Sequence, residues 1–216
     1  MAPTPVCQEQ DSWSALPVGE RSRLKARQGV GMVTADEARV VATSGDPDRL
    51  VDVPADGVAM GEIVMRGNTV MKGYFRDPEA TADAFRGGWF HSGDLGVRYP
   101  DGYIELLDRA KDIVISGGEN ISTIEVENAL MSHPAVADVA VIAVPDEQWG
   151  ERPKAFVRLA VGQQADQAEL IAYVKAHIAK FKAPKSVDFV LEVPRTSTGK
   201  LRKQELRDVE WAGHNS

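Results

Sequence analysis

The spacing of apolar residues changes near Asp108, and this change constrains the fold more than any other feature of the sequence. From about residue 30 to 108, short apolar runs are separated by turn sequences such as Tyr99–Gly102, which is typical of a hairpin. Beyond that point, strand-like runs alternate with helical patterns. We therefore predict an α+β chain with a mainly antiparallel β part over about residues 30–108 and a small α+β domain over about residues 110–210.

Local capping chemistry predicts where the helices begin. Asp77–Pro78 is typical of a helix start, because proline tolerates the first turn, where its missing N–H costs nothing. Ser122–Glu125 and Asp166–Glu169 have the spacing of helix N-caps. We expect these helices to end near Gly87, Ser132 and Lys180, with strands over 136–144, 154–159 and 186–191 and a short basic helix after them.

The composition narrows the class of protein. The 216 residues are 43% hydrophobic, carry a formal net charge of −7 and include one cysteine, Cys7, which argues against a disordered or a disulfide-stapled chain. No run approaches the roughly 20 apolar residues that span a bilayer. The first residues also lack the pattern of a secretion signal. We expect a globular, cytoplasmic protein without an integral membrane segment.

The positive charge is concentrated near the end of the chain. From Lys175 to Arg207 there are nine Lys/Arg and three Asp/Glu, a net of +6, whereas the whole chain is acidic. A general nucleic-acid binder needs a broad basic face, so this distribution favours a local basic patch for a small anionic ligand. A solvated helix face is the alternative.

Three polar clusters are candidates for function. Asp94 follows an aromatic pair at a strand end, where a carboxylate can accept two hydrogen bonds from a vicinal diol such as ribose; a plain turn is the alternative. Asp108–Asp112 is either a solvated linker or a hinge with a ligand-binding arginine. The glycine run Ser116–Asn120, which follows this second cluster, allows a ligand to approach its backbone, although it matches neither common phosphate-loop pattern. Pro194–Lys203 is a hydroxyl-rich turn whose Lys200 is a point charge suited to neutralising two anions.

The order and spacing of these clusters resemble the adenylate-forming superfamily of acyl-CoA synthetases, nonribosomal peptide adenylation domains and luciferases. Two stretches near the start, 13–17 and 24–30, resemble its branch that activates short- and medium-chain fatty acids. The resemblance implies that 1–108 is the last, β-rich part of the large adenylation domain and that 109–216 is the AMP-binding enzyme C-terminal domain. The matching stretches, in the family's order, are 61–67, 71–75, 77–81, 88–96, 108–122, 144–157 and 194–203.

The resemblance also implies roles for individual residues in adenylate formation. Asp94 would bind the ribose hydroxyls of ATP or AMP, and Arg109 would contact the ribose and phosphate region. Lys200 would be the catalytic lysine of the adenylation step. The chain departs mildly from the family at Ser92, where Thr is usual, and at Arg195, where Lys is common. Neither departure changes a proposed role.

A second group of residues would serve thioester formation. Lys111 would be the hinge about which the small domain turns after pyrophosphate leaves. Gly117, Gly118 and Glu119 would line the tunnel for the pantetheine arm of coenzyme A. The expected substrates are a carboxylic acid, ATP and coenzyme A, with Mg²⁺ as the metal of the complete enzyme; no metal-ligating residue is predicted in this chain.

Two motifs of the family are missing from this chain: a Ser/Thr/Gly-rich phosphate loop ending in Pro-Lys, and a Tyr-Gly-x-Thr-Glu segment. The chain therefore looks like the last third of a fatty acid–CoA ligase, truncated and inactive without an N-terminal adenylation domain, which could be a separate partner. A non-catalytic binding or regulatory module is the alternative. Retention of Asp94, Arg109 and Lys200 favours the ligase.

Overall fold

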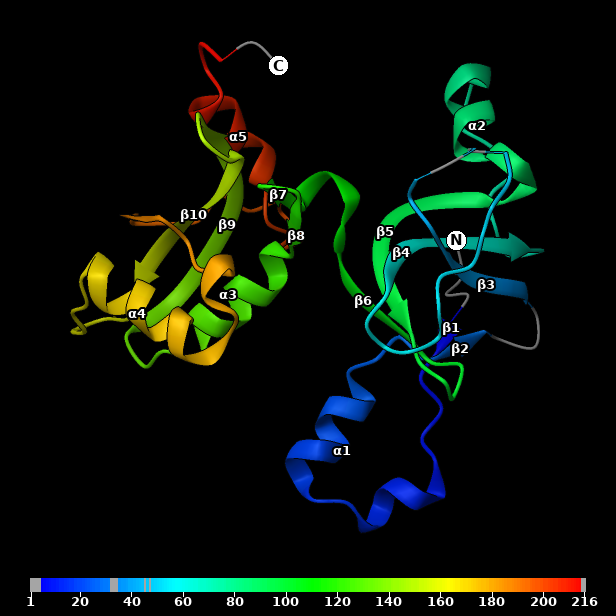
Figure 1. Cartoon of the computed structure of the whole chain (residues 1–216), viewed down its shortest axis with the longest axis horizontal. Coiled ribbons are helices and arrows are strands. Elements are labelled where there is room, and N and C mark those ends of the chain that lie inside the picture. The colour runs from blue at the N-terminus through cyan, green and yellow to red at the C-terminus, as the bar shows by residue number, and fades with distance from the viewer. Residues whose placement is uncertain (1–4, 32–34, 45, 47, 215–216) are drawn as a thin grey trace. The chain divides into compact units, whose positions relative to one another are not determined.

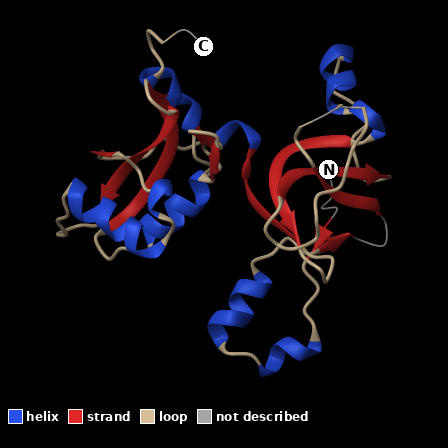
Figure 2. Ribbon diagram, viewed as in Figure 1, coloured by secondary structure: helices blue, strands red, loops and turns tan. Residues whose placement is uncertain are grey.

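A computed structural model describes residues 5–31, 35–44, 46 and 48–214 of the chain. The chain forms two compact units, Met1–Ala110 and Lys111–Ser216. Figure 1 labels their helices and strands, and Figure 2 shows that strands dominate the first unit while strands and helices alternate in the second. The predicted α+β class, with antiparallel-rich sheets, is confirmed.

The first unit is built around a four-stranded antiparallel sheet in the order β3-β4-β5-β6. Alternate residues of β3 and β4 face two small cores, one around Ile63 and Ile104 and one around Val64 and Trp89. The predicted turn at Tyr99–Gly102 joins β5 to β6 through a Gly102 N–H bond to the Tyr99 carbonyl (2.9 Å). The elements are β1 Pro5–Val6, η1 Asp11–Ala15, α1 Val18–Lys25, β2 Val30–Gly31, β3 Ala35–Val41, β4 Met60–Gly67, α2 Pro78–Ala84, η2 Arg86–Gly88, β5 Phe90–Arg98 and β6 Ile104–Arg109.

The second unit contains a five-stranded sheet in which β10 pairs with β9 and β7 in antiparallel fashion and with β11 in parallel. Its elements are η3 Ala110–Asp112 at the unit boundary, β7 Val114–Ser116, β8 Glu119–Ile121, α3 Thr123–Met131, β9 Val136–Asp146, β10 Gly150–Leu159, α4 Gln167–His177, η4 Lys180–Lys182, β11 Ser186–Phe189 and α5 Lys203–Glu210.

Alternation along β9 and β10 explains how helices cover both faces of this sheet. Val139, Val141 and Val157 pack with apolar residues of α3 and α4. Ile142 and Phe156, on the opposite face, pack against Leu206 of α5. Apolar side chains therefore cover the centre of both faces, and the burial of this apolar area stabilises the sheet.

The predicted N-caps form as expected. The Asp77, Ser122 and Asp166 side chains accept hydrogen bonds from the backbone N–H groups of Ala80 (2.9 Å), Glu125 (3.2 Å) and Glu169 (2.8 Å). Several details differ from the sequence prediction: β10 begins at Gly150 instead of residue 154, and β11 ends at Phe189 instead of residue 191. The helix after Asp166 ends at His177, before the expected Lys180, and a separate strand, β8, lies between the glycine turn and α3.

Candidate functional site

Asp94 and Arg109 lie opposite each other on neighbouring strands of the first unit. They are paired residues in the β5–β6 register, and the Arg109 Nε atom lies 3.6 Å from Asp94 Oδ1. Their side chains are 35% and 56% exposed, so a ligand can reach both. The fold thus brings together the two residues for which the resemblance implied nucleotide contacts.

Glu62 of β4 contacts the part of β5 in front of Asp94, where the register between the two strands shifts. Its Oε1 atom accepts a hydrogen bond from the Gly93 N–H (3.1 Å), and Oε2 lies 2.7 Å from Nδ1 of His91. Burial raises the pKa of Asp94 above its ordinary value of 3.8; the Arg109 guanidinium opposes this rise, and the Glu62 carboxylate adds to it. We predicted no role for Glu62, although an acidic residue directly before the apolar run 63–65 was a visible signal.

Lys111 is the first residue of the second unit and lies, exposed, in the short 3-10 helix η3. The next residue, Asp112, is fixed to its own unit because it accepts a hydrogen bond from the Arg207 guanidinium of α5. The preceding Ala110 closes the first unit. Lys111 therefore lies at the connection between two compact bodies.

The glycine turn between β7 and β8 needs residues without a side chain. Gly117 and Gly118 have φ angles of +60° and +87°, which L-residues rarely adopt. At Gly117 there is a further reason: a Cβ atom would lie 2.6 Å from Cε3 of Trp149. The Gly117 N–H also donates to the Trp149 carbonyl (2.9 Å), so ring and turn are in contact.

Asp146 holds Trp149 in this place. Its Oδ1 atom accepts hydrogen bonds from the backbone N–H groups of Gln148 (3.0 Å) and Trp149 (2.9 Å), which shapes the turn between β9 and β10. The Trp149 N–H is the main cause that lowers the pKa of Asp146 below its ordinary 3.8. A carboxylate therefore organises the turn that places the indole against Gly117.

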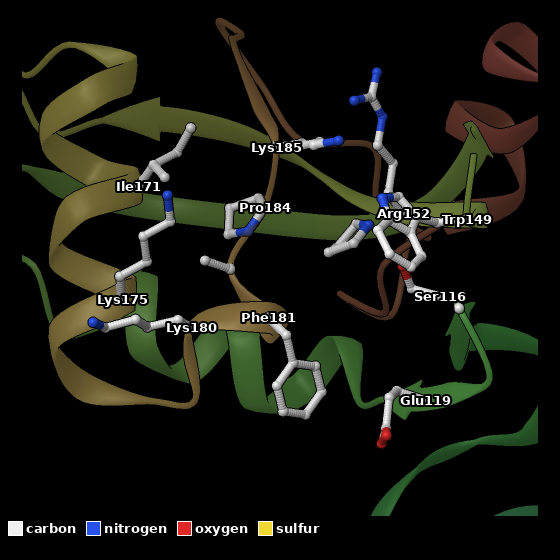
Figure 3. Close-up of a pocket in the computed structure, with 13 residues that line it drawn as sticks. Ser116, Glu119, Trp149, Arg152, Ile171, Lys175, Lys180, Phe181, Pro184 and Lys185 are labelled. Atoms are coloured by element: carbon white, nitrogen blue, oxygen red, sulfur yellow. The ribbon is translucent and has the colours of Figure 1, made fainter. Parts of the chain in front are cut away.

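This corner of the second unit forms a pocket of about 450 Å³. Its lining combines four cationic side chains, two aromatic rings and the glycine turn, with Glu119 as an acidic member (Figure 3). Gly117 and Glu119, for which the resemblance implied coenzyme A contacts, are part of it. The lining residues are Ser116, Gly117, Glu119, Trp149, Arg152, Pro153, Ile171, Lys175, Lys180, Phe181, Ala183, Pro184 and Lys185.

The basic end of the sequence divides into two groups in the structure. Lys175, Lys180 and Lys185 line the pocket. The others mostly form ion pairs with carboxylates: Lys182–Glu125, Arg195–Asp138, Arg202–Glu205, Lys203–Glu127 and Arg207–Asp112. Much of the local positive charge that the sequence displays is therefore paired with carboxylates, and three of the other lysines lie at one pocket.

Lys200 lies exposed in the loop between β11 and α5 of the second unit, and the pocket lining does not include it. No group of three or more His, Cys, Asp or Glu side chains within the described part of the chain is arranged to hold a metal ion. Across the same described residues, no helix is long and apolar enough to cross a membrane.

Sequence reasoning missed the aromatic part of the pocket. Trp149 and Phe181 come from segments far from the glycine turn, and only the turn after β9 and the path after α4 bring them to it. Both are about half exposed. For Phe181 the available signal was its place between Lys180 and Lys182 in the sequence.

Comparison with known proteins shows which families and relatives this chain is similar to. The family model of the AMP-binding enzyme C-terminal domain matches residues 125–200. An acetate–CoA ligase (CCL3) of Humulus lupulus is 50% identical over 210 residues, covering 95% of this chain and 36% of that protein. A peroxisomal butyrate–CoA ligase (AAE11) of Arabidopsis thaliana is 45% identical over 213 residues, covering 97% and 36%. The chain therefore spans about a third of the length of the curated relatives that it matches.

Solved structures agree with the sequence match. The ATP-bound structure of MatB from Rhodopseudomonas palustris superposes with a TM-score of 0.76 at 37% identity, covering 85% of this chain and 35% of that one. The curated relatives are named as ligases, so the comparisons lend no support to the non-catalytic alternative. Residues 125–200 thus match the AMP-binding enzyme C-terminal domain, and the chain is similar to the C-terminal portion of adenylate-forming enzymes.

Proposed function

We propose that this chain is the C-terminal part of an acyl-CoA synthetase, which forms an acyl-adenylate from ATP and a carboxylic acid and then transfers the acyl group to coenzyme A. The observation that carries the proposal is the cationic, aromatic pocket beside Gly117. It has the chemistry that a phosphorylated adenine nucleotide with a long flexible arm requires. The ligase names of the matched relatives support the same class of reaction.

The Asp94–Arg109 pair would hold the nucleotide in the first half-reaction. An ionised carboxylate accepts hydrogen bonds from two neighbouring ribose hydroxyls, and a guanidinium donates to phosphate oxygens. Both side chains are accessible and lie 3.6 Å apart, so one nucleotide can touch both. The Asp94 side chain is 35% exposed, so its site is partly shielded from water, and hydrogen bonds are stronger in such a shielded site.

The pocket would hold coenzyme A in the second half-reaction. Lys175, Lys180 and Lys185 offer charge to its phosphates, and Trp149 and Phe181 offer faces on which the adenine can stack. The pantetheine arm would pass the turn at Gly117 and Gly118, with Glu119 beside it. At Gly118 nothing lies within 4 Å of the place where a Cβ would be, which leaves space for that passage.

Lys200 and Lys111 would link the two half-reactions. A fatty carboxylate and the α-phosphate of ATP are both anionic, so a lysine at their meeting point lowers the cost of bringing them together. Lys200 is exposed on a loop, as that role requires. After pyrophosphate leaves, turning about Lys111 would withdraw Lys200 and bring the 117–119 turn to the acyl-adenylate.

The acid is proposed to be short-chained, because the matched relatives include ligases named for acetate and butyrate. The proposed partner is an N-terminal adenylation domain, since the chain spans about a third of these relatives. The cytoplasmic location stays a prediction, because the butyrate–CoA ligase is named as peroxisomal.

Pyrophosphate exchange with a panel of carboxylic acids tests the proposal. The chain is assayed alone and as a joined enzyme, in which it is fused to the part of the Humulus lupulus acetate–CoA ligase that lies outside the match. We expect no exchange from the chain alone and acid-dependent exchange from the joined enzyme. Clear activity of the chain alone would overturn its dependence on a partner. A joined enzyme that is folded yet inactive with every acid would overturn the ligase assignment.

A further inference from the structure

The loop that carries Lys200 is a small hairpin with its own backbone bonds. Thr196 N–H donates to the Lys200 carbonyl (2.8 Å), Gly199 N–H to the Thr196 carbonyl (2.9 Å) and Arg202 N–H to the Pro194 carbonyl (2.9 Å). The Lys200 N–H donates to the Thr196 hydroxyl (3.1 Å). These bonds set the shape of the hairpin, but they do not attach it to the sheet.

Arg195 attaches the hairpin to the sheet, and all three of its guanidinium nitrogens form hydrogen bonds. Its Nε and Nη2 atoms donate to the two carboxylate oxygens of Asp138 on β9 (3.2 and 2.6 Å). Its Nη1 atom donates to the Gly199 carbonyl, the residue before Lys200 (2.7 Å). One side chain therefore connects the tip of the hairpin to a strand of the central sheet.

The Asp138 side chain is only 16% exposed, and the geometry is the two-pronged pairing of a guanidinium with a carboxylate. A lysine has one terminal nitrogen, so it cannot engage both carboxylate oxygens and the Gly199 carbonyl in this planar arrangement. The arginine that stands where the family commonly has lysine thus has a distinct structural use.

The hairpin is also anchored on its far side. Lys203, at the start of α5, is buried, and its Nζ atom donates to the Thr123 hydroxyl (2.7 Å) and pairs with Glu127 Oε1 of α3 (2.8 Å). Lys200 thus lies exposed between two charged attachments, Arg195 to β9 and Lys203 to α3. The attachments restrict the hairpin while leaving the Lys200 side chain accessible.

We propose that Arg195 is a positioning residue for adenylation: through Asp138 and the Gly199 carbonyl, it holds the hairpin so that Lys200 is presented in one geometry. This inference rests on the proposed role of Lys200. A reaction can lose about 100-fold in rate when a reacting group is displaced by about 1 Å. The hydrogen bonds of Arg195 to Asp138 and to the Gly199 carbonyl, which we call the clamp, should therefore have a measurable effect on Lys200.

Amide hydrogen exchange on the 216-residue chain tests the clamp without any need for activity. We expect the Lys200 and Gly199 amides to exchange at least about 10-fold faster in Arg195→Gln, with the rest of the second unit unchanged. Arg202→Gln is the matched control: it removes one cation from the same loop, but its exposed pair with Glu205 attaches nothing to the sheet. Equal exchange in wild type and Arg195→Gln would overturn the clamp.

Kinetics of the joined enzyme test the positioning role. Arg195→Gln and Asp138→Asn should each lower kcat of acyl-adenylate formation about 10- to 100-fold, with little change in the KM for ATP. Thioester formation from supplied acyl-adenylate should be kept, and Arg195→Lys should recover part of the loss. Because the two residues act as one unit, the double variant should be no slower than either single variant.

Other kinetic outcomes overturn the positioning role. If Asp138→Asn behaves as wild type while Arg195→Gln raises the KM for ATP, Arg195 binds the nucleotide directly. If both half-reactions fall together, the residue is merely structural. If the wild-type joined enzyme forms no acyl-adenylate, the proposed function fails and the positioning role fails with it, whereas the exchange experiment still decides the clamp.

Discussion

Gly117 and Gly118 offer a matched pair of substitutions that isolates one packing contact. Both residues have positive φ, so alanine at either position costs about 1–2 kcal/mol of unfolding free energy through the backbone alone. Only at Gly117 would the new Cβ meet another residue, 2.6 Å from Cε3 and 3.1 Å from Cζ3 of Trp149; at Gly118 nothing lies within 4 Å.

The size of the extra penalty follows from the mobility of the neighbour. Overpacking a well-filled site costs about 1–3 kcal/mol of unfolding free energy. Because the Trp149 side chain is 46% exposed, its ring can move away from the new methyl group. The clash should therefore cost about 1 kcal/mol, at the lower end of that range. We therefore expect Gly117→Ala to lose about 2–3 kcal/mol in total and Gly118→Ala about 1–2 kcal/mol.

Urea unfolding followed by circular dichroism measures both losses. Repeating the pair in a Trp149→Ala background removes the clash, so the two glycine substitutions should then cost the same. The reasoning is refuted if Gly117→Ala and Gly118→Ala are equally destabilising in the wild-type background, or if the difference between them survives the loss of Trp149.

The remaining predictions concern the half-reactions and pH. In the joined enzyme, Lys200→Ala should lower acyl-adenylate formation about 100-fold or more and spare thioester formation from supplied acyl-adenylate; loss of both refutes the assignment. Lys111→Pro should do the reverse in the same two assays, and an unaffected thioester step removes it as the hinge. Because the pKa of Asp94 is raised, its carboxyl group binds a proton more tightly in the folded state than in the unfolded state. The protonated carboxyl group therefore contributes to stability below pH 3.8, and this contribution is lost as pH rises through the folded pKa. Asp94→Asn should therefore unfold at higher urea than wild type near pH 7, and the difference should shrink toward pH 3.8; a less stable variant near pH 7 contradicts this.

Features set by neighbouring residues were predictable from the sequence. The N-caps at Asp77, Ser122 and Asp166 bond to backbone groups three residues away, so the local sequence contains all the chemistry involved. The α+β class followed from apolar periodicity for the same reason. The end of the helix after Asp166 was less accurate, because helix ends depend on packing beyond the local pattern.

Features set by distant residues were not predictable. The contact of Trp149 with Gly117 depends on the turn between β9 and β10, and the sequence pattern does not contain its register. The pairing of Lys182 with Glu125 and of Arg195 with Asp138 likewise joins segments that only the fold brings together. Of the expected site residues, the fold sets Asp94 against Arg109, whereas the catalytic roles themselves stay predictions.

The division of the chain between Ala110 and Lys111 has a consequence for how such proteins can diversify. The core clusters around Ile63 and Val64 lie within the first unit, and those around Val141 and Ile142 lie within the second. A genetic crossover at that peptide bond would therefore exchange one complete core for another without cutting through either. The same bond is a natural junction for building hybrid proteins, in which the residues proposed to hold the nucleotide come from one parent and the loop that carries Lys200 comes from another.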